Sequence, residues 1–193
     1  MENKRKPEAD VDRIFLDRWS PRAFDPTPLS DDSVKSLFEA AKWSPSCSNE
    51  QPWMFLYAVT KKDLAVFLDL LVDGNKVWAK NAPMLVFLFA RRRFAAEGKP
   101  NDWAKFDCGA AWMSLAIQAR KLGLYTHGMA GFHADKVCGT LGVPGDEFDS
   151  VCAIAVGRIG DREALPERLK AREEPNGRNP LAETVFEGRY KSR

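Results

Sequence analysis

The sequence predicts a layered α+β or α/β domain in which helices cover a buried sheet. Two observations support this. Continuous apolar runs at residues 53–59 and 84–90 are typical of strands covered on both faces. The segments around them repeat apolar residues at helical spacing. The chain has 193 residues and a formal net charge of +2, and this length can bury a core without disulfide bonds.

The first helix is predicted after Ser30, which is a favourable N-cap residue. Apolar residues then recur on one helical face, at Val34, Leu37, Phe38 and Ala41. The helix must end before Pro45, because proline cannot continue it. The strand at 53–59 follows, and residues 61–71 have the spacing of a second helix before the strand at 84–90.

The longest helical pattern covers residues 103–122, and Gly123 supplies its C-terminal stop. Small residues gather at 108–111, where they permit close approach of another backbone, either from the same subunit or from a partner. A further apolar run at 151–156 predicts a strand that ends at Gly157.

The two ends of the chain are rich in charged residues. Residues 1–9 are expected to be frayed and disordered, so that a single domain spans residues 10–193. Residues 161–180 combine many charges with prolines, which predicts an extended surface arm.

Composition argues against several classes of partner. The near-balanced charge gives no reason to expect nucleic acid, which requires a basic excess on one face. The apolar runs are shorter than the roughly 20 residues of a membrane helix, and the start lacks the apolar core of a signal peptide. The cysteines at 47, 108, 138 and 152 have no disulfide or zinc spacing. We therefore expect a cytoplasmic protein without a membrane partner.

Motifs for nucleophilic, metal and nucleotide chemistry are missing from the sequence. His127 and His133 do not share a helical face and have no ligand cluster around them, so we predict no metal site and interpret both as surface or satisfied loop histidines. There is no GxSxG, Walker A or GxGxxG motif. Difficult chemistry would therefore require a cofactor that these motifs do not bind.

Arg18, Ser20 and Arg22 form the first polar cluster, at a break that Pro21 is expected to enforce between two helical stretches. Two guanidinium groups and the free N–H groups of a helix start can bind a phosphate. The alternative is surface arginines beside an N-cap serine.

Three further clusters follow along the chain. Residues 44–53 form a loop rich in hydroxyl and amide groups, where Asn49 and Gln51 can read a heteroaromatic edge or simply make local turns. Residues 126–132 place two glycines after an expected strand, either for close passage of a flat ligand or for a tight turn. Arg178 ends the charged arm and is either a ligand or a solvated side chain.

Taken in order, these motifs resemble the FMN-dependent nitroreductase family. The resemblance rests on Arg-x-Ser-x-Arg at 18–22, Glu-Ala-Ala at 39–41, Asn-x-Gln-Pro-Trp at 49–53, Leu-Gly-Val-Pro at 141–144 and Pro-Leu after Arg178. It covers residues 12–190, nearly the whole chain. It implies an α+β sandwich with a central, mostly antiparallel sheet flanked by helices, and a homodimer that binds FMN at its subunit interface.

The resemblance also implies roles for individual residues. The FMN phosphate and ribityl chain would be held by Arg18, Trp19, Ser20, Arg22 and Arg178. The flavin ring would be approached by Pro45, Ser46, Cys47 and Asn49 of the other subunit, with Gln51 close by. Met129, Ala130 and Gly131 would lie along the ring. Cys47 is interpreted as a small thiol without a redox role.

The activity implied is reduction of nitroaromatics, quinones or similar small-molecule acceptors by hydride exchange at flavin N5, with NADPH or NADH as electron donor. The flavin carries the chemistry, so no catalytic side chain is expected. Relatives of this fold also dehalogenate, dehydrogenate azoline rings or fragment flavin, and a flavin-binding protein without turnover is a further alternative. An interaction module without flavin would leave the arginine motifs without a role.

The segment at 90–107 corresponds to the part of the family that varies in length and covers the substrate. Here it contains Arg91, Arg92, Arg93 and Trp103. We hypothesise that the three arginines favour the phosphates of NAD(P)H or an anionic acceptor, the alternative being a solvated basic loop.

Overall fold

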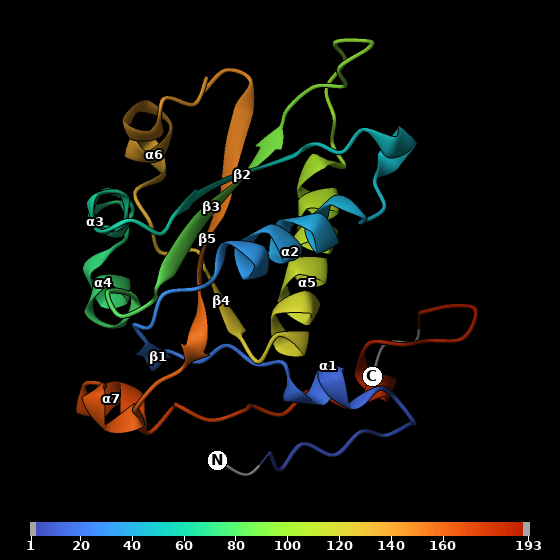
Figure 1. Ribbon diagram of the computed structural model, residues 1–193. Coiled ribbons are helices and arrows are strands. Elements are labelled where there is room, and N and C mark those ends of the chain that lie inside the picture. Colours follow the sequence, from blue (N-terminus) through green and yellow to red (C-terminus); the bar gives the residue numbers. More distant parts are fainter. Residues whose placement is uncertain (1–2, 191–193) are drawn as a thin grey trace.

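The computed structural model describes residues 3–190 and contains a five-stranded sheet between two layers of helices (Figure 1). The strands are β1 (Phe24–Asp25), β2 (Trp53–Ala58), β3 (Met84–Arg91), β4 (Tyr125–Met129) and β5 (Phe148–Ile159). Their order is β1–β5–β3–β2, with β4 paired to β5. All pairings between these strands are antiparallel. The predicted α+β sandwich is therefore confirmed.

Helices cover both faces of the sheet (Figure 1). One face carries α2 (Asp31–Lys42) and α5 (Ala104–Lys121), and the other carries α3 (Lys61–Asp69), α4 (Asp73–Ala79) and α6 (Ala134–Leu141). The shorter elements are α1 (Arg13–Asp17), α7 (Glu167–Lys170) and the 3-10 turns η1 (Cys47–Asn49), η2 (Arg162–Ala164) and η3 (Leu181–Glu183). In the described part of the chain, no helix is long and apolar enough to cross a membrane.

Strand β3 explains the continuous apolar run at 84–90. Met84 and Val86 pack into the cluster formed with α2 and α5, whereas Leu85, Phe87 and Phe89 pack into the cluster on the opposite face. Because side chains alternate along a strand, a strand covered on both faces must be apolar at every position. The prediction for this strand is confirmed.

Strand β2 is also covered on both faces, because Met54 and Leu56 pack against one core cluster and Trp53 and Phe55 against the other. It is an edge strand, paired only with β3 among the described strands, so its first four side chains are half-buried and Tyr57 is 48% exposed. The predicted end of the last strand at Gly157 was wrong, because β5 continues to Ile159. A Cβ at Gly157 would lie 2.7 Å from Pro83 Cδ, so glycine permits close packing there instead of ending the strand.

The ends of the main helices agree with their predicted caps. Ser30 Oγ accepts a hydrogen bond from the Ser33 amide at 3.2 Å at the start of α2. Gly123 follows α5 with a positive φ of 73°. The small residues of α5 divide between two sides: Cys108 is fully buried, whereas a Cβ added at Gly109 would meet nothing within 4 Å in this chain.

The flanking segments pack more closely than the charge pattern indicates. Asn3 and Arg5 hydrogen-bond to the C-terminal part of α1, in contrast to the expectation of a frayed segment; Met1 and Glu2 lie outside the described residues. The arm at 161–180 contains η2 and α7 and buries Leu165, Leu169 and Glu173. It is therefore not simply an extended surface arm.

Candidate functional site

Residues 18–22, which contain Arg18 and Arg22, connect α1 to β1. Arg18 is the C-cap of α1, and an extended stretch containing Pro21 leads into β1. The predicted break between two helices was therefore wrong, since no helix starts at Arg22. An anion bound here would depend on the guanidinium groups and not on the N-terminus of a helix.

The Glu173 carboxylate binds two backbone amides of this segment. Its Oε1 accepts hydrogen bonds from the N–H groups of Arg22 and Ala23 at 2.7 and 2.8 Å. The Glu173 side chain comes from the charged arm and is only 2% exposed. Sequence reasoning missed this residue, although its spacing of four from Leu169 and eight from Leu165 was an available signal that one side of the arm faces the core.

Trp19 turns its indole into the protein. The side chain is 5% exposed and meets the Tyr125 ring edge-on, with 6.1 Å between ring centroids. The Arg120 guanidinium lies 3.7 Å from the centroid of the same Tyr125 ring. The indole therefore acts as a core side chain, and Trp19 can face a ligand through its backbone. Ser20 and Arg22, by contrast, are half-buried.

His127 links this segment to β4. Its Nδ1 lies 2.8 Å from the Pro21 carbonyl oxygen, and its ring contacts that of Trp78 of α4, with 4.5 Å between ring centroids and an interplanar angle of 39°. Burial, with a smaller contribution from the charge of Arg22, lowers the pKa of His127 to about 4. The imidazole is therefore neutral at pH 7, with Nδ1–H donating to Pro21, because a carbonyl can only accept. The interpretation as a satisfied histidine holds, but within a strand and not in a loop.

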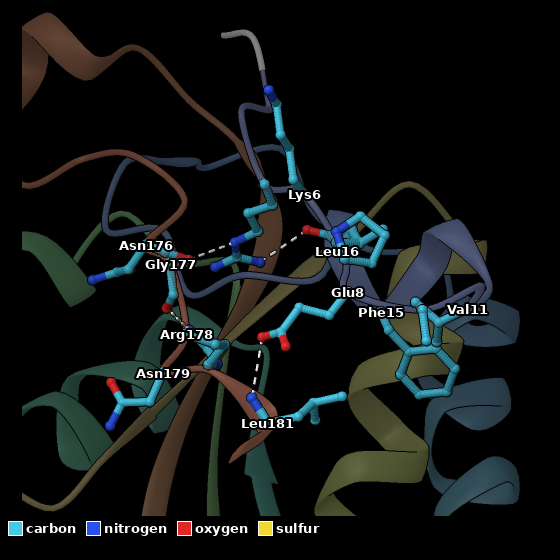
Figure 2. Close-up of a pocket in the computed structure, with 13 residues that line it drawn as sticks. Lys6, Glu8, Val11, Phe15, Leu16, Asn176, Gly177, Arg178, Asn179 and Leu181 are labelled. Carbon is cyan, nitrogen blue, oxygen red and sulfur yellow. Dashed lines mark hydrogen bonds between the residues drawn. The ribbon is translucent and has the colours of Figure 1, made fainter. Parts of the chain in front are cut away.

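Arg178 lies at the meeting point of the two ends of the chain. It lines a cavity of about 360 Å³ whose walls come from residues 5–16 and 176–181 (Figure 2). Burial lowers the pKa of Arg18, and the charge of Arg178 lowers it further. Like charges are thus placed near each other, which favours an anion between them.

The loop at 45–51 is shaped by its own hydrogen bonds and by α5. Ser46 Oγ accepts from the Gln51 amide at 3.0 Å, and Gln51 Nε2 donates to the Asn49 carbonyl at 3.1 Å. The Cys47 amide donates to the Asp107 carboxylate at 3.1 Å. Asp107 is 3% exposed and was missed in the sequence, where it is one charged residue among many. Pro45 is exposed at the start of this loop.

Strain marks the same loop. Ser48, Asn49 and Gln51 have positive φ angles of 53°, 56° and 51°. Such conformations cost side-chain-bearing residues about 1 kcal/mol or more each. Strained loops of this kind are common at ligand sites, where the surrounding structure holds them in place.

Residues 129–131 form the end of β4 and the turn after it. The predicted order was wrong in one respect, because Gly128 lies inside the strand. Met129 is buried, Ala130 is exposed, and Gly131 accepts hydrogen bonds from the Val72 amide at 3.1 Å and from Asn75 Nδ2 at 3.0 Å. A Cβ at Gly131 would lie 2.7 Å from Asn75 Nδ2. Asn75 is a further residue that sequence reasoning missed.

Two of the sequence-predicted groups lie apart within the chain. The loop at 45–51 meets α5 at Asp107, whereas the group around Trp19 meets the other end of α5 through Tyr125 and Arg120 (Figure 1). These two α5 positions are 13 residues apart, which is about 20 Å along the helix. A single chain therefore does not bring the two groups together.

The chain is similar to known proteins over most of its length. The model of the nitroreductase family matches residues 16–72 and 61–158 of the chain. The chain belongs to the nitroreductase family. A solved structure described as an oxidoreductase containing FMN is 44% identical, with a TM-score of 0.95, over 100% of this chain and 99% of that one.

Other members of the family are more distant. A protein of Rhodopseudomonas palustris (strain TIE-1), described as a candidate NADH dehydrogenase/NAD(P)H nitroreductase, is 28% identical over 144 residues, which are 65% of this chain and 74% of the relative. The crystal structure of a nitroreductase family protein from Streptococcus pneumoniae TIGR4 shares the fold, with a TM-score of 0.73 and 20% identity over 91% of this chain and 98% of that one.

In this nitroreductase-family protein, Arg91 at the end of β3 and the two arginines that follow it each have a partner within the chain. The Arg91 guanidinium lies 5.1 Å from the centroid of the Phe148 ring, Arg92 pairs with Asp149 at 2.8 Å, and Arg93 Nη1 donates to the Gly98 carbonyl at 2.8 Å. These contacts favour a structural role for the basic loop. Trp103, at the start of α5, is 58% exposed.

Proposed function

We propose that this nitroreductase-family protein is an FMN-dependent NAD(P)H oxidoreductase that reduces nitroaromatics, quinones or similar acceptors. The main support is the 44% identity, over the whole chain, to a structure described as an oxidoreductase containing FMN. The relative from R. palustris, described as a candidate NAD(P)H nitroreductase, supports the choice of electron donor. Bound FMN would supply a ring that accepts and returns a hydride.

The residues present fit the phosphate end of FMN. Arg178 is near enough for its charge to add to the effect of burial in lowering the pKa of Arg18, and within the described residues neither arginine lies in an ion pair. A phosphate dianion would relieve this repulsion and accept hydrogen bonds from planar guanidinium groups. Arg22 and the hydroxyl of Ser20 would complete the set, with the backbone of Trp19.

The strand end at 129–131 fits a flat ligand. Gly131 has no room for a side chain on the side of Asn75, and the carbonyl of Gly131 is occupied by Val72 and Asn75. The turn is thus held in one conformation. Met129, Ala130 and Gly131 would lie along the flavin ring and orient it, while excluding water from one edge.

The loop at 45–51 would reach the flavin ring of a second copy of the chain. This assignment is supported by the separation of about 20 Å between the two groups of residues and by the outward face of α5. On that face Gly109 has open space, and Phe106 is 73% exposed. Trp43, which follows α2, is 77% exposed. A partner helix seated on this face would bury apolar surface and bring Pro45, Ser46, Cys47, Asn49 and Gln51 to the other subunit's site.

The visible absorption spectrum tests the cofactor and the reaction together. Purified protein should show a flavin band that bleaches on anaerobic addition of NADPH or NADH, and an added nitroaromatic or quinone should restore it. A band that stays oxidised with both nucleotides would favour a flavin-binding protein without turnover. If excess FMN leaves no bound flavin, the proposal is wrong.

A double substitution tests the phosphate site. Arg18→Ala with Arg22→Ala should release FMN while the protein remains folded, because the guanidinium groups that balance the phosphate are lost. Lys61→Ala with Lys62→Ala removes the same charge from exposed positions on α3 and should retain FMN. Wild-type flavin stoichiometry in the arginine variant would show that the phosphate binds elsewhere.

A single substitution tests the contribution of a second chain. Gly109→Trp fills open space on one chain but would block the approach of a partner helix. Light scattering should show a dimer for the wild type and a monomer for the variant, and the monomer should retain little FMN. A wild-type monomer that binds FMN stoichiometrically would contradict the assignment of residues 45–51 to a partner's site.

A further inference from the structure

The N-terminal segment joins two parts of the chain that are far apart in sequence. Arg5 Nη1 donates to the carbonyl oxygens of Leu16 at 2.8 Å and Arg18 at 2.7 Å. Arg5 Nε donates to the Asn176 carbonyl at 2.7 Å. Figure 2 shows Leu16 and Asn176 on opposite sides of the same cavity, with hydrogen bonds reaching toward both. One guanidinium group therefore bridges α1 and the C-terminal arm.

These bridged positions carry the two arginines assigned to the FMN phosphate. Arg18 is itself one of the carbonyl partners of Arg5, and Arg178 follows Asn176 by two residues. A second contact closes the same junction, because Glu8 accepts a hydrogen bond from the Leu181 amide at 3.1 Å. The relative position of Arg18 and Arg178 thus depends on contacts made by Arg5 and Glu8.

The charge at this junction points to an anion. Burial lowers the pKa of Arg5, and the charges of Arg178 and Arg18 lower it further. Asp17 acts in the opposite direction, but its carboxylate is engaged by Asn3 and Arg13. Among the described residues, no carboxylate forms an ion pair with Arg5, Arg18 or Arg178. Because the Arg5 hydrogen bonds hold the backbone segments of Arg18 and Arg178 next to each other, three cationic residues gather at this junction, which suits it to a doubly charged ligand.

We propose that Arg5 is a positioning residue for the flavin phosphate: by bridging the Arg18 and Asn176 carbonyls it holds Arg18 and Arg178 in register for the dianion. This proposal rests on the proposed function and extends it to cofactor choice. The N-terminal segment closes the phosphate end of the site and makes the protein select FMN over riboflavin, which has the same ring and no phosphate.

Equilibrium dialysis with FMN and with riboflavin tests the proposal without relying on turnover. Arg5→Ala should raise the Kd for FMN about tenfold, since hydrogen bonds from a charged group of this kind are worth about one decade in affinity or more. The Kd for riboflavin should stay at its wild-type value. Arg5→Lys keeps the charge but loses the planar fork, so it should behave nearly like Arg5→Ala.

Lys4→Ala is the matched control. Lys4 is the cation next to Arg5, but it is exposed and does not line the cavity. This variant should bind FMN like the wild type. If Lys4→Ala and Arg5→Ala weaken FMN equally, the effect is one of net charge and the positioning role is wrong.

The remaining outcomes distinguish a failure of the role of Arg5 from a failure of the proposed flavoenzyme function. Unchanged FMN affinity in Arg5→Ala, or equal weakening of FMN and riboflavin, would overturn the role of Arg5 while leaving the flavoenzyme intact. A wild-type protein that binds neither flavin would overturn the proposed function and, with it, the role of Arg5. Far-UV circular dichroism of each variant identifies any loss of binding that comes from unfolding.

Discussion

Replacing Glu173 by alanine removes a buried anchor between the C-terminal arm and the segment of the candidate phosphate site. Glu173 Oε1 accepts hydrogen bonds from the Arg22 and Ala23 amides at 2.7 and 2.8 Å. The side chain is 2% exposed, so water does not readily replace the lost acceptor. In the variant, two backbone N–H groups lose their partner in the interior.

The magnitude follows from these two hydrogen bonds. A hydrogen bond to a charged acceptor contributes about 1.5–3 kcal/mol, so two give about 3–6 kcal/mol. The lower end applies here, because removing a buried carboxylate also removes its desolvation cost. We therefore expect Glu173→Ala to lower the free energy of unfolding by about 3 kcal/mol, which for a chain of this size lowers Tm by about 6–12 °C. Glu173→Gln keeps an oxygen acceptor and should lose less.

Urea unfolding followed by tryptophan fluorescence measures this loss, with FMN removed so that cofactor binding does not contribute. Glu174→Ala is the matched control, because it removes the neighbouring carboxylate from an exposed position and should stay within about 0.5 kcal/mol of the wild type. A loss below about 1 kcal/mol in Glu173→Ala would refute the anchoring role.

Three other predictions concern single residues. Burial lowers the pKa of His127 from 6.5 to about 4. The stability that depends on a neutral imidazole is therefore fully present above pH 6.5 and is lost as the pH falls toward 4, by up to about 3 kcal/mol. Urea unfolding of His127→Asn should accordingly show a flatter pH dependence of the free energy of unfolding in this range. Burial raises the pKa of Cys108 to about 12, so mass spectrometry should find iodoacetamide on the half-buried Cys47 long before it appears on Cys108. Gly131→Ala should lower stability by about 1–3 kcal/mol because its Cβ would lie 2.7 Å from a neighbouring side chain, whereas Gly139→Ala, with open space in α6, should not destabilise; equal thermal shifts in these two variants would contradict the crowding at position 131.

The elements that the sequence predicted correctly are those governed by neighbouring residues. Ser30 caps α2 and Gly123 ends α5, and both act within one helical turn of their own position. The run at 84–90 is apolar at every position because both faces of β3 are covered. The run that forms β2 also packs on both faces, but an apolar run does not reveal that, among the described strands, β2 has no neighbour on its second edge.

The candidate site also divides into features set by the local sequence and features set by tertiary contacts. The motifs around Arg18, Asn49 and Arg178 indicated the family and the residue types of the site, because their order and spacing are properties of the sequence itself. Their placement was decided by tertiary structure: Cys47 lies at one end of α5 and Trp19 near the other. No local pattern encodes that separation.

The residues that hold the site in place could be found only in the folded chain. In the sequence nothing distinguishes Glu173, Asp107 and Arg5 from ordinary surface charges. In the structure Glu173 and Asp107 are buried, and each accepts a hydrogen bond from the backbone N–H of a distant segment. Capping and periodicity act over a few residues and are therefore visible in the sequence. The burial of a charge depends on a partner that can be 150 residues away, as for Ala23 and Glu173, so only the tertiary structure decides it.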